Sequence, residues 1–312
     1  MPFHTSQKGV ALITALLIVA MATVISVNLS KHLQLDIRRT GNTIASDQAL
    51  LYLMEAEYWS RRILKSDREK NDYDSLDEDW AMDIPPLPVE GGQIRGKLTD
   101  LQACFNVNSL YHDGKPDELA ITRFKLLSQQ LAAPVSFDLS QAIIDWLDTD
   151  LETTIPDGAE DNYYLNLDGS YRSANQAMQS LSELRLIKGF ENKITLEQMQ
   201  GWLCAFGTNA TINVNTAPKE VLKSLSADMR DDTVANIITL REDEPFETMK
   251  DFMDKNKLSE IIKETEGLSV SSNYFLLESE AKIGQATTLM YSIIQRDNDG
   301  KTQVIARSLG AY

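Results

Sequence analysis

Residues 10–29 read VALITALLIVAMATVISVNL and contain no charged side chain. As an α-helix, about 20 residues span about 30 Å, which matches the hydrocarbon core of a bilayer. A cleaved secretion signal has a shorter apolar centre of about 7 to 15 residues, followed by a small-residue cleavage site. Here the small residue beside a basic one, Gly9 after Lys8, comes before the apolar run. The run therefore predicts a membrane-spanning helix that stays on the mature protein.

The following segment extends this helix. Residues 30–66 contain no proline and are rich in helix formers, with a loosely helical apolar stripe. The stripe consists of Leu33, Leu35, Ile37, Ala45, Leu50, Leu53 and Ala56. Basic residues follow the span, whereas only Lys8 precedes it, so the positive-inside rule alone would place the large domain in the cytoplasm. Another feature has to decide the topology.

Beyond the helix, the chain predicts strands at both ends of a helical middle. Strand-like alternation at 94–98 and 104–108 returns at 273–297 and 301–309, and Asn298, Asp299 and Gly300 between the last two predict a hairpin turn. Helical patterns occupy 117–132, 139–148, 180–189, 196–206, 218–226 and 231–242. The economical architecture is an α+β fold with a long N-terminal helix and a small antiparallel sheet, interrupted by a large α-helical insertion.

We divide the chain accordingly. The acidic, turn-rich stretch 66–92 is typical of a linker off the long helix. The expected parts are a leader 1–9, a transmembrane part 10–29, the rest of the helix 30–66, a linker with the first strands 67–108, a helical insertion 109–270 and C-terminal strands 271–312.

The densest cluster of chemically active side chains lies in DWLDTDLETTIPDGAEDNYYLNLDGSY, residues 145–171. Between Asp145 and Asp161 there are seven carboxylates and no lysine or arginine. Like charges repel, and Pro156 and Gly158 interrupt a helix, so the segment must fold back as a loop. The spacing is not that of an EF-hand, so the pattern fits either a solvated acidic loop or a Ca²⁺ site built from carboxylate oxygens.

The two cysteines, Cys104 and Cys204, are 100 positions apart. In a reducing cytosol they would be two separate core thiols, whereas in an oxidising compartment a single pair is a natural disulfide. The Cys104–Cys204 bridge is therefore expected if the domain is exported.

Charge argues against nucleic acid or anionic lipid as the main partner. The formal net charge is −16, and binding phosphate requires a basic surface. Residues 211–254 resemble tandem helix-hairpin-helix units, a module often used to bind DNA phosphates. Residues 211–257, however, carry seven Lys or Arg against ten Asp or Glu and no glycine. We expect a packed helical module that presents a surface to protein, with a core of Val221, Leu222, Leu225, Val234, Ile237, Ile238 and Leu240.

An enzyme is the competing class of function. The acidic loop has paired carboxylates with Trp146, Tyr163 and Tyr164 nearby, as a membrane-anchored periplasmic hydrolase would require. No motif pairs a nucleophile with a base, and the three histidines, His4, His32 and His112, assemble neither a zinc site nor a catalytic triad. We therefore assign no catalytic residue.

The N-terminus resembles the type IV pilin and type II secretion pseudopilin families. The resemblance rests on a short hydrophilic leader ending in Lys8-Gly9, an uncharged span and a long helix. It implies that prepilin peptidase cuts after Gly9, that Val10 becomes the new N-terminus, and that the mature chain is methylated. Family members carry a glutamate at the fifth mature position, where this chain has Thr14. A threonine hydroxyl can instead bond to a carbonyl one turn back in the same helix.

That departure resembles the protein K family of type II secretion minor pseudopilins. The pattern D-W-x-D-x-D…P-x-G-A-E-D-x-Y-Y is similar to the calcium-binding segment of that family, and the layout agrees over nearly the whole chain. The resemblance implies a pilin-like fold and Ca²⁺ ligands at Asp148, Asp150, Glu160 and Asp161, with Asp157 or Asn162 as further ligands. Tyr163 and Tyr164 are expected to pack beneath the loop.

The resemblance also implies a function and partners. The chain would assemble with proteins I and J at the tip of a periplasmic pseudopilus and would interact with prepilin peptidase and the inner-membrane assembly platform. It would cross the inner membrane once, with most of its residues in the periplasm. The alternative is a minor pilin of a type IV pilus.

Overall fold

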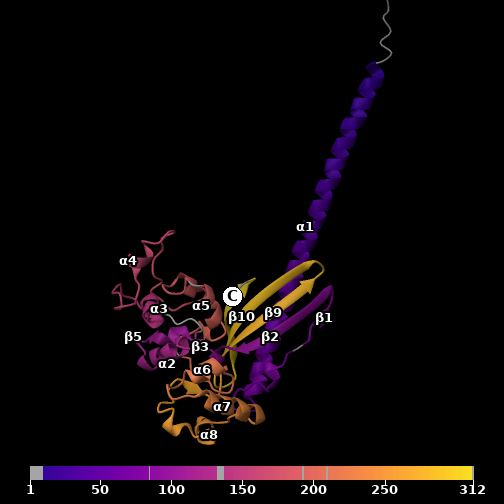
Figure 1. Cartoon of the computed structure of the whole chain (residues 1–312). Helices are drawn as coiled ribbons and strands as arrows, with labels where there is room; N and C mark the ends of the chain where they lie inside the picture. Colours follow the sequence, from indigo (N-terminus) through magenta and orange to yellow (C-terminus); the bar gives the residue numbers. More distant parts are fainter. Residues whose placement is uncertain (1–9, 84, 132–136, 192, 209, 311–312) are drawn as a thin grey trace, which may run out of the picture.

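The computed structural model of the chain describes residues 10–83, 85–131, 137–191, 193–208 and 210–310. The expected leader 1–9, with Gly9, lies outside the described residues. Helix α1, Val10–Arg68, is one unbroken helix of 59 residues, so it is about 88 Å long. Among the described residues it is the one helix long and apolar enough to cross a membrane. Its N-terminal part projects away from the rest of the molecule (Figure 1).

The C-terminal half of α1 packs on a sheet through one helical face. The buried residues are Ala49, Leu53, Glu57, Ser60, Leu64 and Asp67. Their spacing of three or four places them on one stripe of the helix. Of the stripe expected from the sequence, Leu53 is buried, Ala45, Leu50 and Ala56 are half-buried, and residues 33 to 37 are exposed on the projecting part of the helix. The buried face also includes three polar side chains, which a search for apolar periodicity cannot find.

The sheet has five antiparallel strands in the order β1-β2-β9-β10-β11. The strands are β1 Leu87–Val89, β2 Gly92–Asp100, β9 Tyr274–Ile283, β10 Ala286–Arg296 and β11 Thr302–Leu309. The expected turn between β10 and β11 is present, and Gly300 takes the positive φ of 79° that it requires. A short helix, η1 Asp79–Ala81, packs Trp80 against Phe275 of β9, with ring centroids 5.1 Å apart.

The helical region lies between β2 and β9 in sequence and beside the sheet in space. In Figure 1 it occupies the end of the molecule opposite the projecting part of α1. Its helices are η2 Leu101–Ala103, η3 Val107–Leu110, α2 Glu118–Ser128, α3 Leu139–Leu147, α4 Asp161–Tyr164, η4 Leu181–Leu186, α5 Lys193–Met199, α6 Lys219–Lys223, α7 Asp231–Asp243, α8 Met249–Lys255 and η5 Leu258–Glu260. Its short strands are β3 Phe105–Asn106, β4 Tyr111–His112, β5 Lys115–Pro116, β6 Leu203–Cys204, β7 Ile212–Asn213 and β8 Leu268–Ser269.

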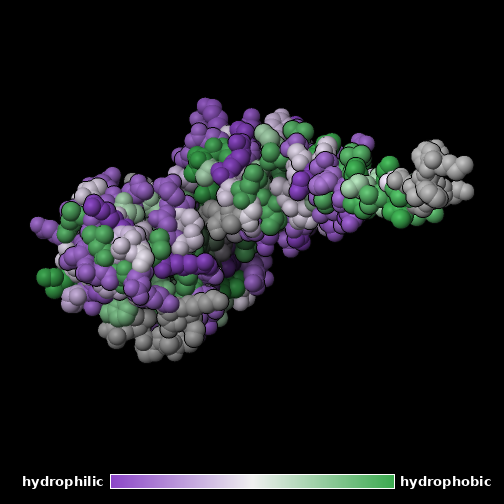
Figure 2. Space-filling view, turned by 90° about the horizontal axis from the view of Figure 1, so that it is seen from above, coloured by the Kyte–Doolittle hydropathy of each residue, from purple (hydrophilic) through white to green (hydrophobic). Residues whose placement is uncertain are grey.

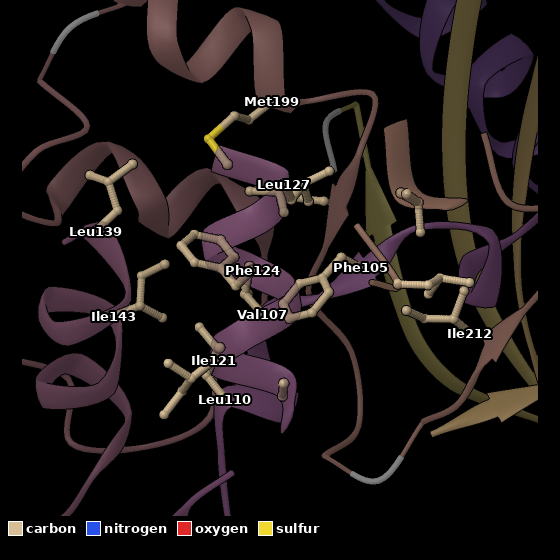
Figure 3. Packing of buried hydrophobic residues seen from close by; sticks show 14 of the residues in the cluster. Phe105, Val107, Leu110, Ile121, Phe124, Leu127, Leu139, Ile143, Met199 and Ile212 are labelled. Atoms are coloured by element: carbon tan, nitrogen blue, oxygen red, sulfur yellow. The ribbon is translucent and has the colours of Figure 1, made fainter. Parts of the chain in front are cut away.

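This region has a hydrophobic core of its own. Figure 3 shows Phe124 of α2 between Ile143 of α3 and Phe105 of β3. The rings of Phe105 and Phe124 lie 5.6 Å apart. The core extends through α6 and α7, where Val221, Leu222, Leu225, Val234 and Ile237 are buried as expected, and Ile238 and Leu240 are partly buried against it.

The observed architecture confirms the expected α+β fold with a long N-terminal helix, a small antiparallel sheet and a helical region within it. Two helical predictions need correction. Residues 181–186 form a 3₁₀ turn, and the helix expected at 196–206 ends at Met199, because Leu203 and Cys204 pair with β3. Helix α8, which packs Met249, Phe252 and Met253 against the core, was not predicted.

Candidate metal centre and assembly surface

The acidic loop begins where α3 ends and is supported by aromatic side chains. Asp148 is the C-terminal cap of α3, and the chain returns to α4 at Asp161. Tyr164 is fully buried, meets Trp146 edge to face at 5.4 Å and stacks on Tyr171 at 5.3 Å. The aromatic residues therefore pack beneath the loop and give it a rigid base.

Three buried carboxylates meet inside the loop. Asp145, Asp148 and Glu160 each offer one oxygen, and these oxygens lie within 4.8 Å of one another. Asp145 is held by the backbone N–H of Thr154, at 3.2 and 3.1 Å from its two oxygens. A Cβ at position 158 would lie 2.2 Å from Asp145 Oδ2, so Gly158 is the residue that lets the loop close over this carboxylate.

Several of these oxygens have no hydrogen-bond partner among the described residues. They are Asp148 Oδ1, Glu160 Oε1, Glu160 Oε2 and the amide oxygen of Asn175, all buried. The Asn175 amide nitrogen donates to the carbonyl of Asp150 at 2.9 Å, which places this side chain against the same loop. Buried anionic oxygens without donors are costly unless a cation or a proton neutralises them. Three carboxylate oxygens and one amide oxygen fit the donor set of Ca²⁺.

The raised pKa values of two of these carboxyls also indicate that the negative charge of the cluster is costly without a cation. Burial, with the charges of Asp150 and Asp145, raises the pKa of Asp148 to about 6. Burial, with the charges of Asp148 and Asp145, raises the pKa of Glu160 to about 7. Without a cation, the site therefore takes up protons near neutral pH.

The structure brings together only part of the ligand set expected from the sequence. Asp148 and Glu160 meet in the cluster, and Asp150 is exposed beside it, with Oδ1 accepting from the Glu152 N–H at 2.7 Å. The other expected ligands have different partners. Asp157 Oδ2 accepts from the Asp138 N–H at 2.9 Å, Asp161 Oδ1 accepts from the Ser173 N–H at 3.0 Å, and Asn162 is exposed.

Two residues of the site were missed by the sequence analysis as ligands. Asp145 was counted among the acids, but it lies on the buried face of α3 beside Ala142 and Trp146, and a carboxylate on such a face is the signal that identifies it. Asn175 lies outside the acidic run, so no sequence pattern singles it out.

A disulfide joins the start of the helical region, just after η2, to β6 within it. Cys104 and Cys204 are bonded, with Cα atoms 5.9 Å apart and a sequence separation of 100. The bond lies beside the parallel pair of β3 and β6, where Asn106 is opposite Cys204. The expected pairing is therefore present in the structure.

The second candidate surface is the exposed side of α1. Figure 2 shows apolar side chains gathered on its projecting end, and residues 10–44 have no buried side chain. Closer to the sheet, Leu51, Met54, Tyr58 and Trp59 form an exposed apolar set, which we call the outer stripe. A groove of about 160 Å³ adjoins it, with Trp59, Trp80 and Met82 in its walls. Such a contiguous apolar surface is typical of a protein or membrane contact.

Thr14 lies near the start of α1. Its hydroxyl donates to the carbonyls of Val10 and Ala11, at 3.1 and 3.0 Å. The side chain is thus satisfied inside its own helix, as expected, and puts no charge into the span.

Comparison with known proteins identifies the family. A family model described as type II secretion system (T2SS), protein K, matches residues 103–208, and a second model of the same description matches 212–271. The chain is 32% identical to type II secretion system protein K of Pseudomonas aeruginosa, over 97% of this chain and 93% of that protein. It is also 32% identical to the protein of the same name from Aeromonas hydrophila, over 99% of each chain.

A solved structure agrees with these matches. A chain of the GspK-GspI-GspJ complex from the type 2 secretion system of enterotoxigenic Escherichia coli superposes with a TM-score of 0.76. That chain is 26% identical, and the match covers 88% of this chain and 100% of that one. This chain therefore belongs to the protein K family of the type II secretion system and is a minor pseudopilin.

Proposed function

We propose that this minor pseudopilin assembles with two others, proteins I and J, as the tip of a periplasmic pseudopilus, and that it acts by assembly rather than catalysis. The proposal rests on the arrangement of two parts of the fold, the exposed apolar helix and the helical region. An exposed apolar helix is free to pack with other subunits, and a bulky helical region occupies the opposite end of the molecule. Figure 1 shows α1 projecting at one end of the molecule and the helical region at the other.

The projecting helix supplies the anchor. Residues 10–29 would hold the subunit in the inner membrane, with the bulk of the chain in the periplasm, until it is drawn into the filament. The Cys104–Cys204 disulfide supports this topology against the count of basic residues, because disulfides persist in oxidising compartments. Prepilin peptidase would cut after Gly9, and the new N-terminus at Val10 would be methylated.

The helical region supports the place at the tip. It lies beside the sheet, at the end of the molecule opposite the projecting part of α1, so a subunit stacked above would have to share its space. We take the chain to be divided at the expected bounds, with the helical insertion at 109–270 and the pilin-like parts on either side. Thr14 agrees with a tip position. A subunit with none ahead of it would have no partner amine for a carboxylate in its membrane-spanning segment, and the Thr14 hydroxyl needs none.

The partners are proposed from the complex named above, in which a similar chain is found with GspI and GspJ. The outer stripe of α1 offers these subunits an apolar surface outside the membrane. The inner-membrane assembly platform is a further proposed partner. A minor pilin of a type IV pilus would use the same helix in the same way, and the protein K family match favours secretion.

Calcium is the proposed structural ion of the acidic loop. Asp145, Asp148, Glu160 and Asn175 would hold it, and its charge would offset the repulsion among the three carboxylates. The ion would fix the loop between α3 and α4 rather than take part in a reaction.

Capture of the partner subunits tests the proposed assembly. Leu51 is 64% exposed on the outer stripe, and Leu186 is 44% exposed in the helical region, so Leu51→Glu and Leu186→Glu make the same chemical change on two surfaces. Burying one leucine contributes about 1.5–3 kcal/mol, so Leu51→Glu should weaken capture of proteins I and J by about 10-fold or more. Leu186→Glu should leave capture unchanged. Wild-type capture by Leu51→Glu, or equal loss by both variants, would contradict the proposed surface.

A further inference from the structure

A buried polar network joins the end of α1, the sheet and the helical region. Its centre is Arg296, the last residue of β10, whose side chain is 1% exposed. The guanidinium donates to Asp67 at the end of α1, to Asp74 in the segment that follows, and to the carbonyls of Leu64 and Ser272. It also lies over the ring of Phe275, 4.9 Å from its centroid.

Asp74 is the residue that crosses from the pilin-like part to the helical region. Its Oδ2 accepts from Arg296 Nη2 at 2.6 Å and from the Ser272 N–H at 2.8 Å. Its own N–H donates to the carbonyl of Val270 at 2.9 Å, and its carbonyl accepts from Asn213 Nδ2 at 3.0 Å. The attachment of the helical region therefore depends on how firmly Asp74 is held.

Carboxylates outnumber cations in this network. Asp67, Asp74 and Glu78 each offer an oxygen within 4.8 Å of the others, and Arg296 donates to two of them, Asp67 and Asp74. Lys70, the nearest lysine in this segment, pairs instead with Asp79. Three carboxylates beside one guanidinium leave an excess of negative charge, which a proton on one carboxyl offsets.

The hydrogen bonds show which carboxyl accommodates that proton. Glu78 accepts from the Ser75 N–H, from Trp80 and from Asn71, at 2.8 to 2.9 Å. Among the described residues, the Asp67 carboxyl has one donor, Arg296 Nη1, at 3.2 Å. Burial, with the charges of Glu78 and Asp74, raises the pKa of Asp67 to about 7.

A fourth acid, Asp100 at the end of β2, belongs to the same network and behaves differently. Its Oδ2 accepts from Ser272 and Thr216 at 2.6 Å and from Asn213 at 3.2 Å, and its Oδ1 accepts from the Gln102 N–H at 2.7 Å. Burial raises its pKa to about 6, but four donors stabilise its anion. The proton therefore goes to Asp67 rather than to Asp100.

We propose that this junction is a proton-dependent latch, in which a proton on Asp67 relieves its repulsion with Asp74 and Glu78 and tightens the hold of the helical region on the end of α1. Loss of the proton loosens that hold. Because the pKa is raised in the closed state, closure is favoured as the pH falls from about 7 toward the ordinary pKa of an aspartate, and the advantage is lost as the pH rises through 7.

Hydrogen exchange on the full chain in detergent micelles, with excess Ca²⁺ present, tests the latch. The reporters are the amides of Asp74 and Ser272, both of which bridge the junction. After correction for the intrinsic exchange rate, their protection should rise by up to about tenfold per pH unit as the pH falls from 7 to 5. Protection that is flat with pH in the wild-type chain would overturn the proposal without any variant.

Asp67→Asn supplies the second arm, and Asp72→Asn is its matched control. The Asp72 side chain is 95% exposed on the same segment. Asp67→Asn should give the protection of the low-pH state at pH 8 and remove the pH dependence above about pH 6, below which Asp100 also takes up a proton. Asp72→Asn should keep the wild-type profile. If Asp67→Asn lowers protection at every pH, Asp67 is instead the ionised partner that Arg296 requires, and the latch is refuted.

Discussion

Removal of one carboxylate from the acidic loop tests the metal centre directly. Glu160 is 1% exposed, and neither of its oxygens has a hydrogen-bond partner among the described residues. Glu160→Gln keeps the shape of the side chain and removes its charge. We expect this variant to lose the stabilisation that Ca²⁺ gives the wild-type chain, because one of the three clustered carboxylates no longer attracts the ion.

The repulsion among the three carboxylates follows from the distances between their oxygens, and the stabilisation by Ca²⁺ follows from its free concentration relative to Kd. Two unit charges 4.8 Å apart repel by about 3.5 kcal/mol at an effective dielectric constant of 20. Three such pairs give about 10 kcal/mol, which a divalent cation offsets and which protons relieve in its absence. At a free Ca²⁺ concentration of 100 times Kd, binding stabilises the folded chain by about 2.7 kcal/mol. For a domain of about 240 residues, this raises Tm by about 5 to 11 °C.

The pH dependence has a definite sign. The pKa values of Asp148 and Glu160 are raised, to about 6 and about 7, so the metal-free fold binds more protons than the unfolded chain. Its stability is therefore highest below these values and is lost as the pH rises through 6 and 7. Calcium binds the deprotonated carboxylates, so the Tm difference between calcium and chelator should be large at pH 7.5 and much smaller at pH 5.5.

Thermal unfolding with excess calcium and with excess chelator measures this difference. Glu152→Gln is the matched control, because Glu152 is an exposed acid of the same loop outside the cluster. It should keep the full calcium-dependent shift. The reasoning would be refuted if the wild-type Tm at pH 7.5 were the same under both conditions, or if Glu160→Gln kept the wild-type shift.

Two further predictions concern the disulfide and the start of α1. Replacing Cys104 and Cys204 by serine should lower the free energy of unfolding by about 2–5 kcal/mol in denaturant titrations; two free thiols in unreduced, periplasmically expressed protein would contradict the link itself. Thr14→Glu should bring no gain in assembly, because at the proposed tip no subunit ahead would pair the new carboxylate in the bilayer. Stronger cross-linking to partner subunits with unimpaired secretion would instead show that a subunit does lie ahead.

Much of the fold was predictable because local patterns dominate it. The uncharged run 10–29 is identified by its length and apolar character and the stretch 273–297 by its alternation, and the structure has α1 and the β9–β10 hairpin there. The buried face of α1 was not predictable, because Glu57 and Asp67 are paired in the folded state with groups far away in the sequence, and Ser60 bonds to the carbonyl of Ala56 inside the helix. Glu57, for example, accepts from Ser292 and Arg307.

The candidate site was predictable as a segment but not as a ligand set. Carboxylate density marks the loop, yet it cannot show which acids turn inward. Asp157 and Asp161 bond to backbone N–H groups of Asp138 and Ser173, and these contacts depend on the tertiary fold. Asn175 reaches the loop only because the chain returns to it after α4.

The way in which the sheet is divided has a consequence for how the chain folds. Strand β2 can pair with β9 only after the whole helical region between them has been synthesised. Asp100 and Ser272, which are hydrogen-bonded at 2.6 Å, are 172 positions apart. Closing an open loop of that length costs about 4.6 kcal/mol of chain entropy beyond a constant. A helical region that has already collapsed around its own core brings these two ends together and removes most of that cost. We therefore expect the pairing of β2 with β9 to be the last step, and a substitution in the core around Phe124 to be detected first as a defect of that pairing.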